Sequence, residues 1–338
     1  MKIRDALLLA AGAGLVAREL WKRRTEADLA GQVVLITGGS RGLGLALARE
    51  FGAQGCRLVI CARDGQELAR AREDLEGRGI ETLAVPCDVT DPSQVERLIA
   101  QATERFGRVD VLVNNAGIIS VGPVQAMTRA DFEEAMNADF WGTLNPILAV
   151  LPQMRARRGG RIVNVTSIGG KVSVPHLLPY SCAKFAATAL SEGLRAELAR
   201  DGITVTTIAP GLMRTGSYGQ AFVKGDGAGE YAWFSLSDNA PGLSISAARA
   251  AREIARATRR GEAERILSLP ANVAARAQGL APGTTADLLR LVNRMLPHGE
   301  DGGKTTGRTA HAARPSRLLD ALTVLGRRAA HDLNQPDS

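Results

Sequence analysis

Short apolar runs rich in β-branched residues alternate with longer helical patterns from Gly31 onward. This alternation is typical of strand-helix-strand units that build a parallel sheet. The runs stay apolar at most successive positions, as in residues 109–113, which fits strands covered by helices on both faces. The pattern therefore predicts an α/β fold with a doubly wound parallel sheet of the Rossmann type. The predicted strands are 33–37, 57–61, 82–86, 109–114, 161–165, 204–208 and 265–269.

The same pattern divides the chain into three parts. Residues 31–270 carry all predicted strands and form a single main domain, between an N-terminal extension, 1–30, and a C-terminal helical extension, 271–338. Between the last two strands lies an insertion, residues 217–246, that is rich in Gly, Ala and aromatic side chains. We predict a long loop there. Because it follows a strand end, it is a candidate substrate lid.

The C-terminal extension contains a change of composition. Glycine and charged residues gather at 299–304 and predict a flexible linker near residues 298–315. A helical pattern resumes at Ser316, and its apolar stripe consists of Leu318, Leu319, Leu322 and Leu325. This stripe either docks on the core or contacts a partner or a membrane.

The N-terminal extension has an apolar run, residues 6–17, followed by a basic run at 21–24. The apolar run is shorter than the roughly 20 residues that a spanning helix needs. A cleaved signal peptide would carry its positive charges before the apolar stretch. Three interpretations stay open: a packing helix, a membrane-surface helix with a basic flank, and an uncleaved anchor. We expect a cytoplasmic protein, with peripheral membrane contact through residues 6–24 as the alternative.

Composition narrows the function classes. The 338 residues are 45% hydrophobic and 23% charged, which is a globular composition. The net charge is +7, but the Arg residues are spread along helical patterns, so we expect no nucleic-acid partner. The cysteines lack metal-ligand spacing and are interpreted as buried thiols in a reducing compartment; they are Cys56, Cys61, Cys87 and Cys182. No two histidines are four residues apart, and we predict no metal.

A glycine-rich loop follows the first predicted strand directly, and helical periodicity follows the loop. Glycines permit a tight turn, let the backbone approach a pyrophosphate, and leave the N–H groups of the helix N-terminus free for the anion. The loop therefore predicts dinucleotide binding. Its expected cofactor-binding residues are Gly38, Ser40, Arg41, Gly42, Leu43 and Gly44.

The end of the second predicted strand bears on the choice of cofactor. An acidic side chain there would bond the ribose 2′-OH of NAD, but this chain has Cys61-Ala62-Arg63. Arg63 and Arg41 could together bind a 2′-phosphate through charge-assisted hydrogen bonds. We therefore predict NADP(H) in preference to NAD(H).

Tyr180 and Lys184 are four residues apart on a helical pattern, so both side chains lie on one face. Tyrosine has an ordinary pKa of about 10 and is a poor base at neutral pH. A neighbouring ammonium group stabilises the phenolate and lowers that pKa, which makes proton exchange with an alcohol or carbonyl oxygen feasible. The pair predicts a proton-transfer site.

The chain resembles the classical short-chain dehydrogenase/reductases over residues 31–270, in the order and spacing of its motifs. These are the glycine loop, Asn114-Asn115-Ala116-Gly117, Ser167, Tyr180-Ser181-Cys182-Ala183-Lys184 and Pro210-Gly211. The resemblance implies that Tyr180 is the general acid/base, that Lys184 holds the nicotinamide ribose and tunes Tyr180, and that Ser167 bonds the substrate oxygen. It also implies further cofactor contacts, from Asp88, Val89, Asn115, Ala116, Gly117, Pro210, Gly211 and Thr215.

One position departs from the family pattern. The family's active-site Asn would stand three residues before Gly142, where this chain has Asp139. In the family that Asn helps to place a water in a relay to the lysine. An ionised Asp accepts hydrogen bonds but cannot donate them, and its charge would raise the pKa of Lys184. We count Asp139 among the catalytic candidates and expect catalysis to be retained.

These features predict an NADP(H)-dependent oxidoreductase that transfers a hydride between nicotinamide and a carbonyl or secondary alcohol. Aromatic residues of the insertion favour a hydrophobic ketone or aldehyde, unless they belong to the core; they are Phe222, Tyr231, Trp233 and Phe234. The resemblance also implies a homo-oligomer. The alternative is an NADP(H)-binding regulatory or scaffold protein without turnover. Epimerase or dehydratase chemistry is disfavoured by the glycine spacing, and fold alone does not decide function.

Overall fold

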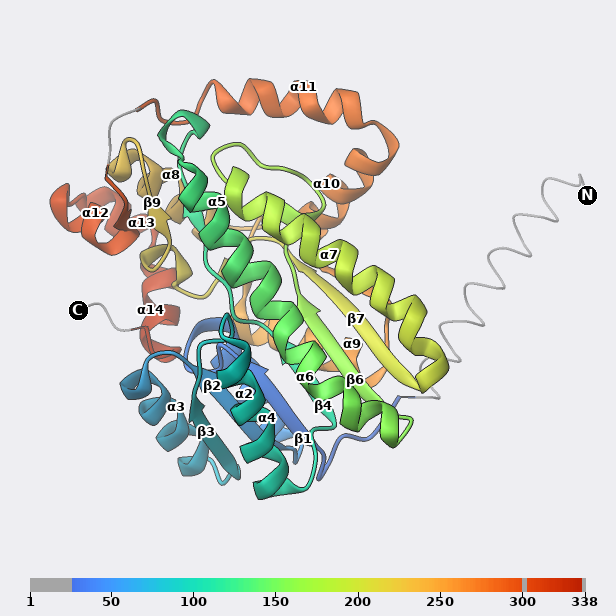
Figure 1. Cartoon of the computed structure of the whole chain (residues 1–338). Helices are drawn as coiled ribbons and strands as arrows, with labels where there is room; N and C mark the ends of the chain where they lie inside the picture. The colour runs from blue at the N-terminus through green and yellow to red at the C-terminus, as the bar shows by residue number, and fades with distance from the viewer. Residues whose placement is uncertain (1–25, 300–302, 336–338) are drawn as a thin grey trace, which may run out of the picture.

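The computed structural model describes residues 26–299 and 303–335, and its centre is a seven-stranded parallel sheet (Figure 1). The strand order is β11-β7-β6-β4-β1-β2-β3, and every pairing in it is parallel. The predicted doubly wound sheet is confirmed, with strand ends that differ from the prediction by two residues or fewer. The strands are β1 (Val33–Thr37), β2 (Arg57–Ala62), β3 (Thr82–Pro86), β4 (Val111–Asn114), β6 (Gly160–Val165), β7 (Ile203–Pro210) and β11 (Glu264–Leu267).

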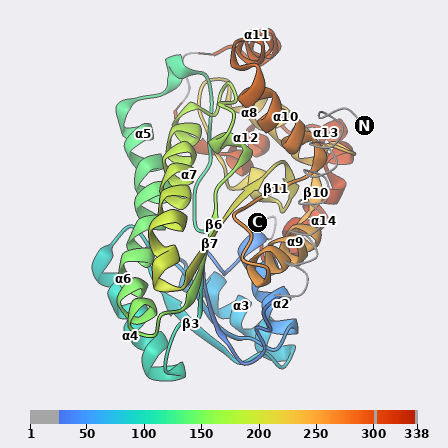
Figure 2. The same ribbon diagram turned by 90° about the vertical axis from the view of Figure 1, so that its right-hand side faces the viewer.

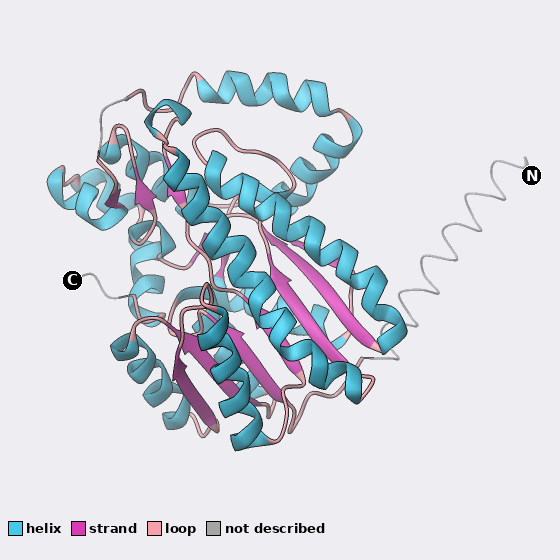
Figure 3. Ribbon diagram, in the orientation of Figure 1, coloured by secondary structure: helices cyan, strands magenta, loops and turns pink. Residues whose placement is uncertain are grey.

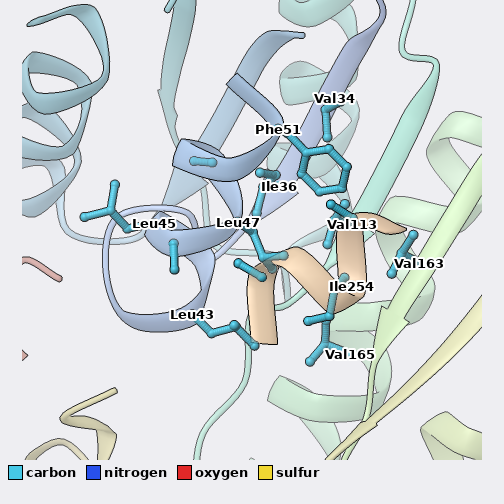
Figure 4. Close-up of a cluster of buried hydrophobic side chains, with 14 of the residues drawn as sticks. Val34, Ile36, Leu43, Leu45, Leu47, Phe51, Val113, Val163, Val165 and Ile254 are labelled. Carbon is cyan, nitrogen blue, oxygen red and sulfur yellow. The ribbon is translucent and has the colours of Figure 1, made fainter. Parts of the chain in front are cut away.

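Helices cover both faces of this sheet (Figure 2). One face carries α2 (Gly42–Ala53), α3 (Gly65–Gly77) and α9 (Ala247–Arg259), and the other carries α4 (Pro92–Phe106), α6 (Gly142–Ala156) and α7 (Leu178–Leu198). Val34 and Ile36 of β1 pack toward Phe51 of α2 and belong to the first core (Figure 4). Val33 and Leu35 belong to the second core. Because successive strand residues point to opposite faces, two buried faces require the apolar runs seen in the sequence.

The insertion at residues 217–246 is not the long loop that we predicted. Its central part forms α8 (Gly227–Asn239). Figure 3 draws this region, which Figure 1 labels, as helix and short strands rather than as one loop. Tyr231 and Phe234 of α8 are buried in a third apolar cluster together with Val121 and Leu319. Helices of this length obtain most of their stability from tertiary packing, which explains why the Gly-rich and Ser-rich sequence did not indicate one. The short flanking elements are η5 (Ser217–Gly219), β9 (Phe222–Val223) and β10 (Ile245–Ser246).

The C-terminal extension is also more ordered than predicted. The expected linker at 298–315 contains β12 (Thr305–Thr306), which pairs antiparallel with β9, and α12 (Gly307–Ala313). His311 of α12 stacks on Tyr231 of α8 with ring centroids 4.9 Å apart. Composition suggested flexibility, but residues 305–313 form regular structure that contacts the insertion.

The predicted leucine stripe does not form one continuous face. The helical region is split at Thr323 into α13 (Arg317–Leu322) and α14 (Val324–Asp332). Leu319 is buried in the third apolar cluster, whereas the other three leucines are exposed. The extension therefore does dock on the body of the protein, but through Leu319 and the small residues Gly326 and Ala330.

The remaining elements connect these layers. They are β5 (Ser120–Val121), β8 (Met213–Arg214), α5 (Arg129–Ala135), α10 (Leu269–Leu280), α11 (Pro282–Asn293), η1 (Val124–Ala126), η2 (Met136–Trp141), η3 (Ile168–Gly170) and η4 (Ala199–Asp201). None of the helices in the described part of the chain is long and apolar enough to cross a membrane. The apolar and basic segment at 6–24 lies outside the described residues.

The cysteines follow the prediction with one exception. Cys56, Cys61 and Cys87 are buried thiols. Cys182 is exposed, because α7 turns its neighbours Ser181 and Ala183 toward the interior and leaves Cys182 on the outer face.

Candidate functional site

A cavity of about 1140 Å³ lies beyond the carboxyl ends of the parallel strands. In open α/β sheets this edge is where ligands bind. All residues predicted from the sequence as catalytic or cofactor-binding line this one cavity. The structure therefore brings together Gly38 and Asp88, which follow different strands, with Tyr180 and Lys184 of α7.

The glycine loop has the shape that a pyrophosphate requires. Gly38 has φ +63°, and a Cβ at Gly44 would overlap the carbonyl oxygen of Gly38. Helix α2 starts at Gly42 without a side-chain cap from Arg41. The N–H of Gly42 itself binds the C-terminal tail, and the amide groups of the next residues in this first turn are the ones that can bind an anion. These residues fit the phosphates of a dinucleotide.

The side chain of Asn115 holds the glycine loop through hydrogen bonds. Its side-chain nitrogen donates to the carbonyl oxygens of Thr37 at 3.0 Å and Gly38 at 3.2 Å. Thr37 in turn accepts through its hydroxyl from the backbone N–H groups of Asn115 and Ala116, at 2.9 and 3.0 Å. Asn115 thus borders the cavity while its side chain holds the glycine loop in place.

Two arginines border the part of the cavity next to β2. Arg41 forms an ion pair with Glu67 of α3 at 2.7 Å, and Ser40 donates a hydrogen bond to the same carboxylate at 3.3 Å. Arg63 is exposed and lines the cavity. Glu67 was not identified from the sequence, and it competes with any ligand phosphate for Arg41.

The C-terminal tail folds back over the glycine loop. The N–H of Gly42 donates to the carbonyl oxygen of Leu333 at 3.0 Å. Asn334 donates to the carbonyl oxygens of Ser40 and Glu67, both at 2.8 Å. The buried Gln335 donates to the carbonyl oxygen of Thr215 at 2.7 Å and lines the cavity. Sequence reasoning missed this contact, because backbone carbonyl partners leave no signature in the residue pattern.

Ser167 and Tyr180 meet at the opposite part of the cavity. Ser167 caps η3, accepting from the N–H of Gly169 at 2.9 Å. A Cβ at Gly169 would lie 3.2 Å from the Tyr180 ring and 3.3 Å from the Ser167 hydroxyl oxygen, so glycine lets the two side chains approach. Lys184 follows one turn later on α7, its Nζ 5.6 Å from the centre of the Tyr180 ring.

Asp139 lies directly beside Lys184. It sits on the π-helical turn η2, a type of distortion that is frequent at functional sites. Its Oδ1 is 3.1 Å from Lys184 Nζ and accepts from the N–H of Ile118 at 3.3 Å. A side chain at Gly117 would overlap this oxygen, so glycine is required there as well. Lys184 also donates to the carbonyl oxygen of Val165 at 3.3 Å.

The charges of this cluster influence one another. Burial raises the pKa of the Tyr180 phenol; Lys184 opposes this effect and Asp139 adds to it. Burial works to lower the pKa of Lys184, but attraction from Asp139 and Tyr180 outweighs it and raises the pKa. Burial also raises the pKa of the Asp139 carboxyl, against the attraction of Lys184. A raised Tyr180 pKa keeps the phenol protonated and able to donate a proton.

Helix α8 forms one wall of the cavity. Trp233 and Phe234 line it, as does Phe222 just before the helix, whereas Tyr231 faces the third apolar cluster. The buried Glu230 holds the helix by accepting from Trp233 Nε1 at 2.6 Å and bonding His176 Nδ1 at 2.7 Å. His176 belongs to the loop between Ser167 and Tyr180, so this network ties the wall to the catalytic candidates. The sequence had no signal for it.

The sequence matches the short chain dehydrogenase family over residues 32–223, which is more than half of the chain. A protein named as a ketoacyl reductase of the granaticin polyketide synthase in Streptomyces violaceoruber is 38% identical over 193 residues, covering 56% of this chain and 71% of that protein. The oxidoreductase UcpA of Escherichia coli is 38% identical over 188 residues, covering 55% and 71%.

Solved structures agree with this match. A short-chain dehydrogenase from Streptomyces avermitilis superposes with a TM-score of 0.68 at 29% identity, covering 80% of this chain and 99% of that one. An actinorhodin polyketide ketoreductase with NADPH superposes with a TM-score of 0.62 at 28% identity, covering 70% and 96%.

Proposed function

This chain belongs to the short-chain dehydrogenase family and is an oxidoreductase of alcohol or carbonyl groups, and from this premise we propose that it reduces apolar ketones or aldehydes with NADPH. The observation that carries the proposal is the meeting of Tyr180, Ser167 and the glycine loop in one cavity. A proton donor and a dinucleotide cradle are the two components that carbonyl reduction requires.

In the proposed mechanism, the hydroxyl groups of Ser167 and Tyr180 hydrogen bond the substrate oxygen and polarise the carbonyl. The bound nicotinamide supplies the hydride. Tyr180 donates its proton to the oxygen, and Lys184 stabilises the phenolate that remains. At neutral pH the Tyr180 phenol is protonated, which is the form that donates a proton in reduction.

We propose that the protein binds NADPH in preference to NADH because of two arginines. Arg41 and Arg63 both line the cavity near the end of β2. The NADPH in the actinorhodin ketoreductase structure gives additional support. Glu67 weakens the contribution of Arg41, since its carboxylate already pairs with the guanidinium.

An apolar substrate is supported by the cavity wall. Trp233 and Phe234 of α8 are joined there by Leu243, and by Val292 and Leu296 at the end of α11. Apolar walls with a few polar groups are typical of small-molecule sites.

We also propose that the protein associates with itself and with membrane surfaces. We propose a homo-oligomer, which light scattering of the purified chain tests. We also propose peripheral membrane contact through residues 6–24, a segment with an apolar run and a basic flank. Fractionation of the full-length chain and of a variant that begins after Arg24 tests this; equal recovery of both from the membrane fraction would exclude it.

The test of the function is NADPH oxidation, followed by absorbance, with a panel of apolar ketones and aldehydes. We expect Tyr180→Phe to reduce kcat roughly 100-fold to 10,000-fold, the contribution of a general acid, while NADPH still binds. Tyr231→Phe is the matched control, because Tyr231 does not line the cavity. Tight NADPH binding without turnover of any substrate would contradict the proposal and favour a regulatory protein.

A further inference from the structure

Asp238, near the end of α8, is a buried carboxyl group without a partner. Its residue is 4% exposed and lines the cavity. Within the described part of the chain it forms no ion pair, and its side chain has no hydrogen bond. The other acidic residue of α8, Glu230, is held by both His176 and Trp233. Since buried carboxyl groups are normally paired, an unpaired one at a ligand cavity indicates that the ligand supplies the partner.

The helix that carries Asp238 is held firmly at both ends. Glu230 holds its first turn. At its last turn, Asn239 accepts from the N–H of Gly326 at 2.7 Å and donates to the carbonyl oxygen of Ser235 at 2.8 Å. Asp238 therefore stays at the cavity and is not free to swing toward a distant partner.

The position of Asp238 is next to the apolar wall and within electrostatic reach of the proton donor. Phe234 lies one helical turn before it, and both residues line the cavity. A charge on Asp238 would raise the pKa of Tyr180, and both residues line the same cavity. Because both residues line the same cavity, one ligand can contact Tyr180 and Asp238 together.

The protonation state determines what Asp238 can bind. Burial raises the pKa of Asp238 to about 8. At neutral pH the group is therefore mainly a neutral carboxylic acid, which donates one hydrogen bond and can accept others. The neutral acid can donate a hydrogen bond to a carbonyl or hydroxyl oxygen of a ligand, whereas an ion pair with an ammonium group would require the ionised carboxylate.

We propose that Asp238 is a substrate-binding residue that hydrogen bonds a second oxygen of the substrate, so that the preferred substrates are apolar ketones with an additional carbonyl or hydroxyl group. This inference rests on the proposed reductase function. It narrows the expected substrates from apolar ketones in general to those that carry a second oxygen-containing group.

The test compares cyclohexanone with the 1,2-, 1,3- and 1,4-cyclohexanediones, which vary the separation of the two oxygens. In the wild type we expect at least one dione to exceed cyclohexanone in kcat/KM. In Asp238→Leu we expect the ratio of kcat/KM for that dione to kcat/KM for cyclohexanone to fall by roughly tenfold, which corresponds to the loss of one neutral hydrogen bond. In Asp238→Asn most of the ratio is kept, because the amide also donates. Asp287→Leu, at an exposed aspartate outside the cavity lining, is the matched control and keeps the wild-type ratio.

Binding is measured separately, by the quenching of tryptophan fluorescence on titration of dione or cyclohexanone into the NADP⁺-saturated protein. A dione affinity that falls in Asp238→Leu more than the cyclohexanone affinity supports the inference even without turnover, in which case only the reductase function fails. An equal loss for both ligands overturns the inference while the function stands. A 4-aminocyclohexanone preference that is lost in Asp238→Asn also overturns it, because the partner is then a cation.

Discussion

The ammonium nitrogen of Lys184 lies 3.1 Å from a carboxylate oxygen of Asp139, and both side chains are buried. The resembled family has Asn where this chain has Asp139. The substitution converts a neutral neighbour of the lysine into its counter-charge. Breaking a buried pair by removing one charge is costly, because the remaining charge is left without compensation.

Asp139→Asn is expected to shift the pH dependence of reduction. Loss of the negative charge favours the phenolate of Tyr180 and therefore lowers its pKa. The pKa of Lys184 falls as well, because Asp139 no longer stabilises the ammonium form. The decline of kcat at alkaline pH should consequently begin at lower pH than in the wild type. A pH profile of NADPH oxidation measures this, and an unchanged alkaline limb would contradict it.

The same variant is expected to lose stability. Asn keeps an acceptor for the N–H of Ile118 but leaves the buried charge of Lys184 unpaired. We expect a loss of about 3 kcal/mol in the free energy of unfolding in urea. Asp201→Asn is the control, since its pair with Arg155 is partly exposed and contributes little. Equal stability of the two variants would argue against a charged Lys184–Asp139 pair.

Glu67→Gln should increase the preference for NADPH. The substitution removes the carboxylate that pairs with Arg41 and leaves the guanidinium available to a 2′-phosphate. We expect the NADPH dissociation constant to fall roughly tenfold relative to that of NADH, as for one hydrogen bond to a charged group. Titration of both cofactors measures the ratio. Glu76→Gln, at an exposed position of the same helix, should leave it unchanged.

Truncation after Asp332 should weaken cofactor binding. The removed tail includes Asn334, which holds the carbonyl groups of Ser40 and Glu67, and Leu333, which binds the N–H of Gly42. Without these bonds the loop must be ordered by the cofactor itself, and that ordering reduces affinity. We expect a roughly tenfold higher Kd for NADPH. Tighter binding after truncation would instead mean that the tail obstructs the site.

Glu230→Gln should affect the substrate more than the cofactor. The carboxylate joins His176 to Trp233 and so ties the cavity wall to the loop before Tyr180. Gln can accept only one of these bonds well, because its second terminal atom is an amide donor. We expect KM for an apolar ketone to rise several-fold, a loss of about 1 kcal/mol, with the NADPH affinity retained. Parallel losses in both would indicate general unfolding rather than a displaced wall.

Most of the sheet and the predicted site positions could be read from local features. Strand runs such as 33–37 follow from apolar periodicity, and the turn at Gly38 follows from backbone sterics, both of which act over a few residues. Tyr180 and Lys184 could be paired because a helix brings residues four apart to one face. The resemblance added Ser167 and Asp88, whose positions relative to Tyr180 no periodicity reveals.

What the sequence by itself determined is therefore the succession along the chain of the strands of the main sheet and the helices between them, the phosphate loop and the set of residues at the strand ends. The tertiary structure alone decided that the insertion forms α8, that Asp238 faces the cavity unpaired, and that Asn334 reaches Ser40 across 294 residues of chain. The physical reason is the distance along the chain over which each interaction acts. Helix periodicity and turn chemistry are encoded within a few neighbouring residues, whereas burial and backbone hydrogen bonds between distant segments depend on the packing of the whole chain.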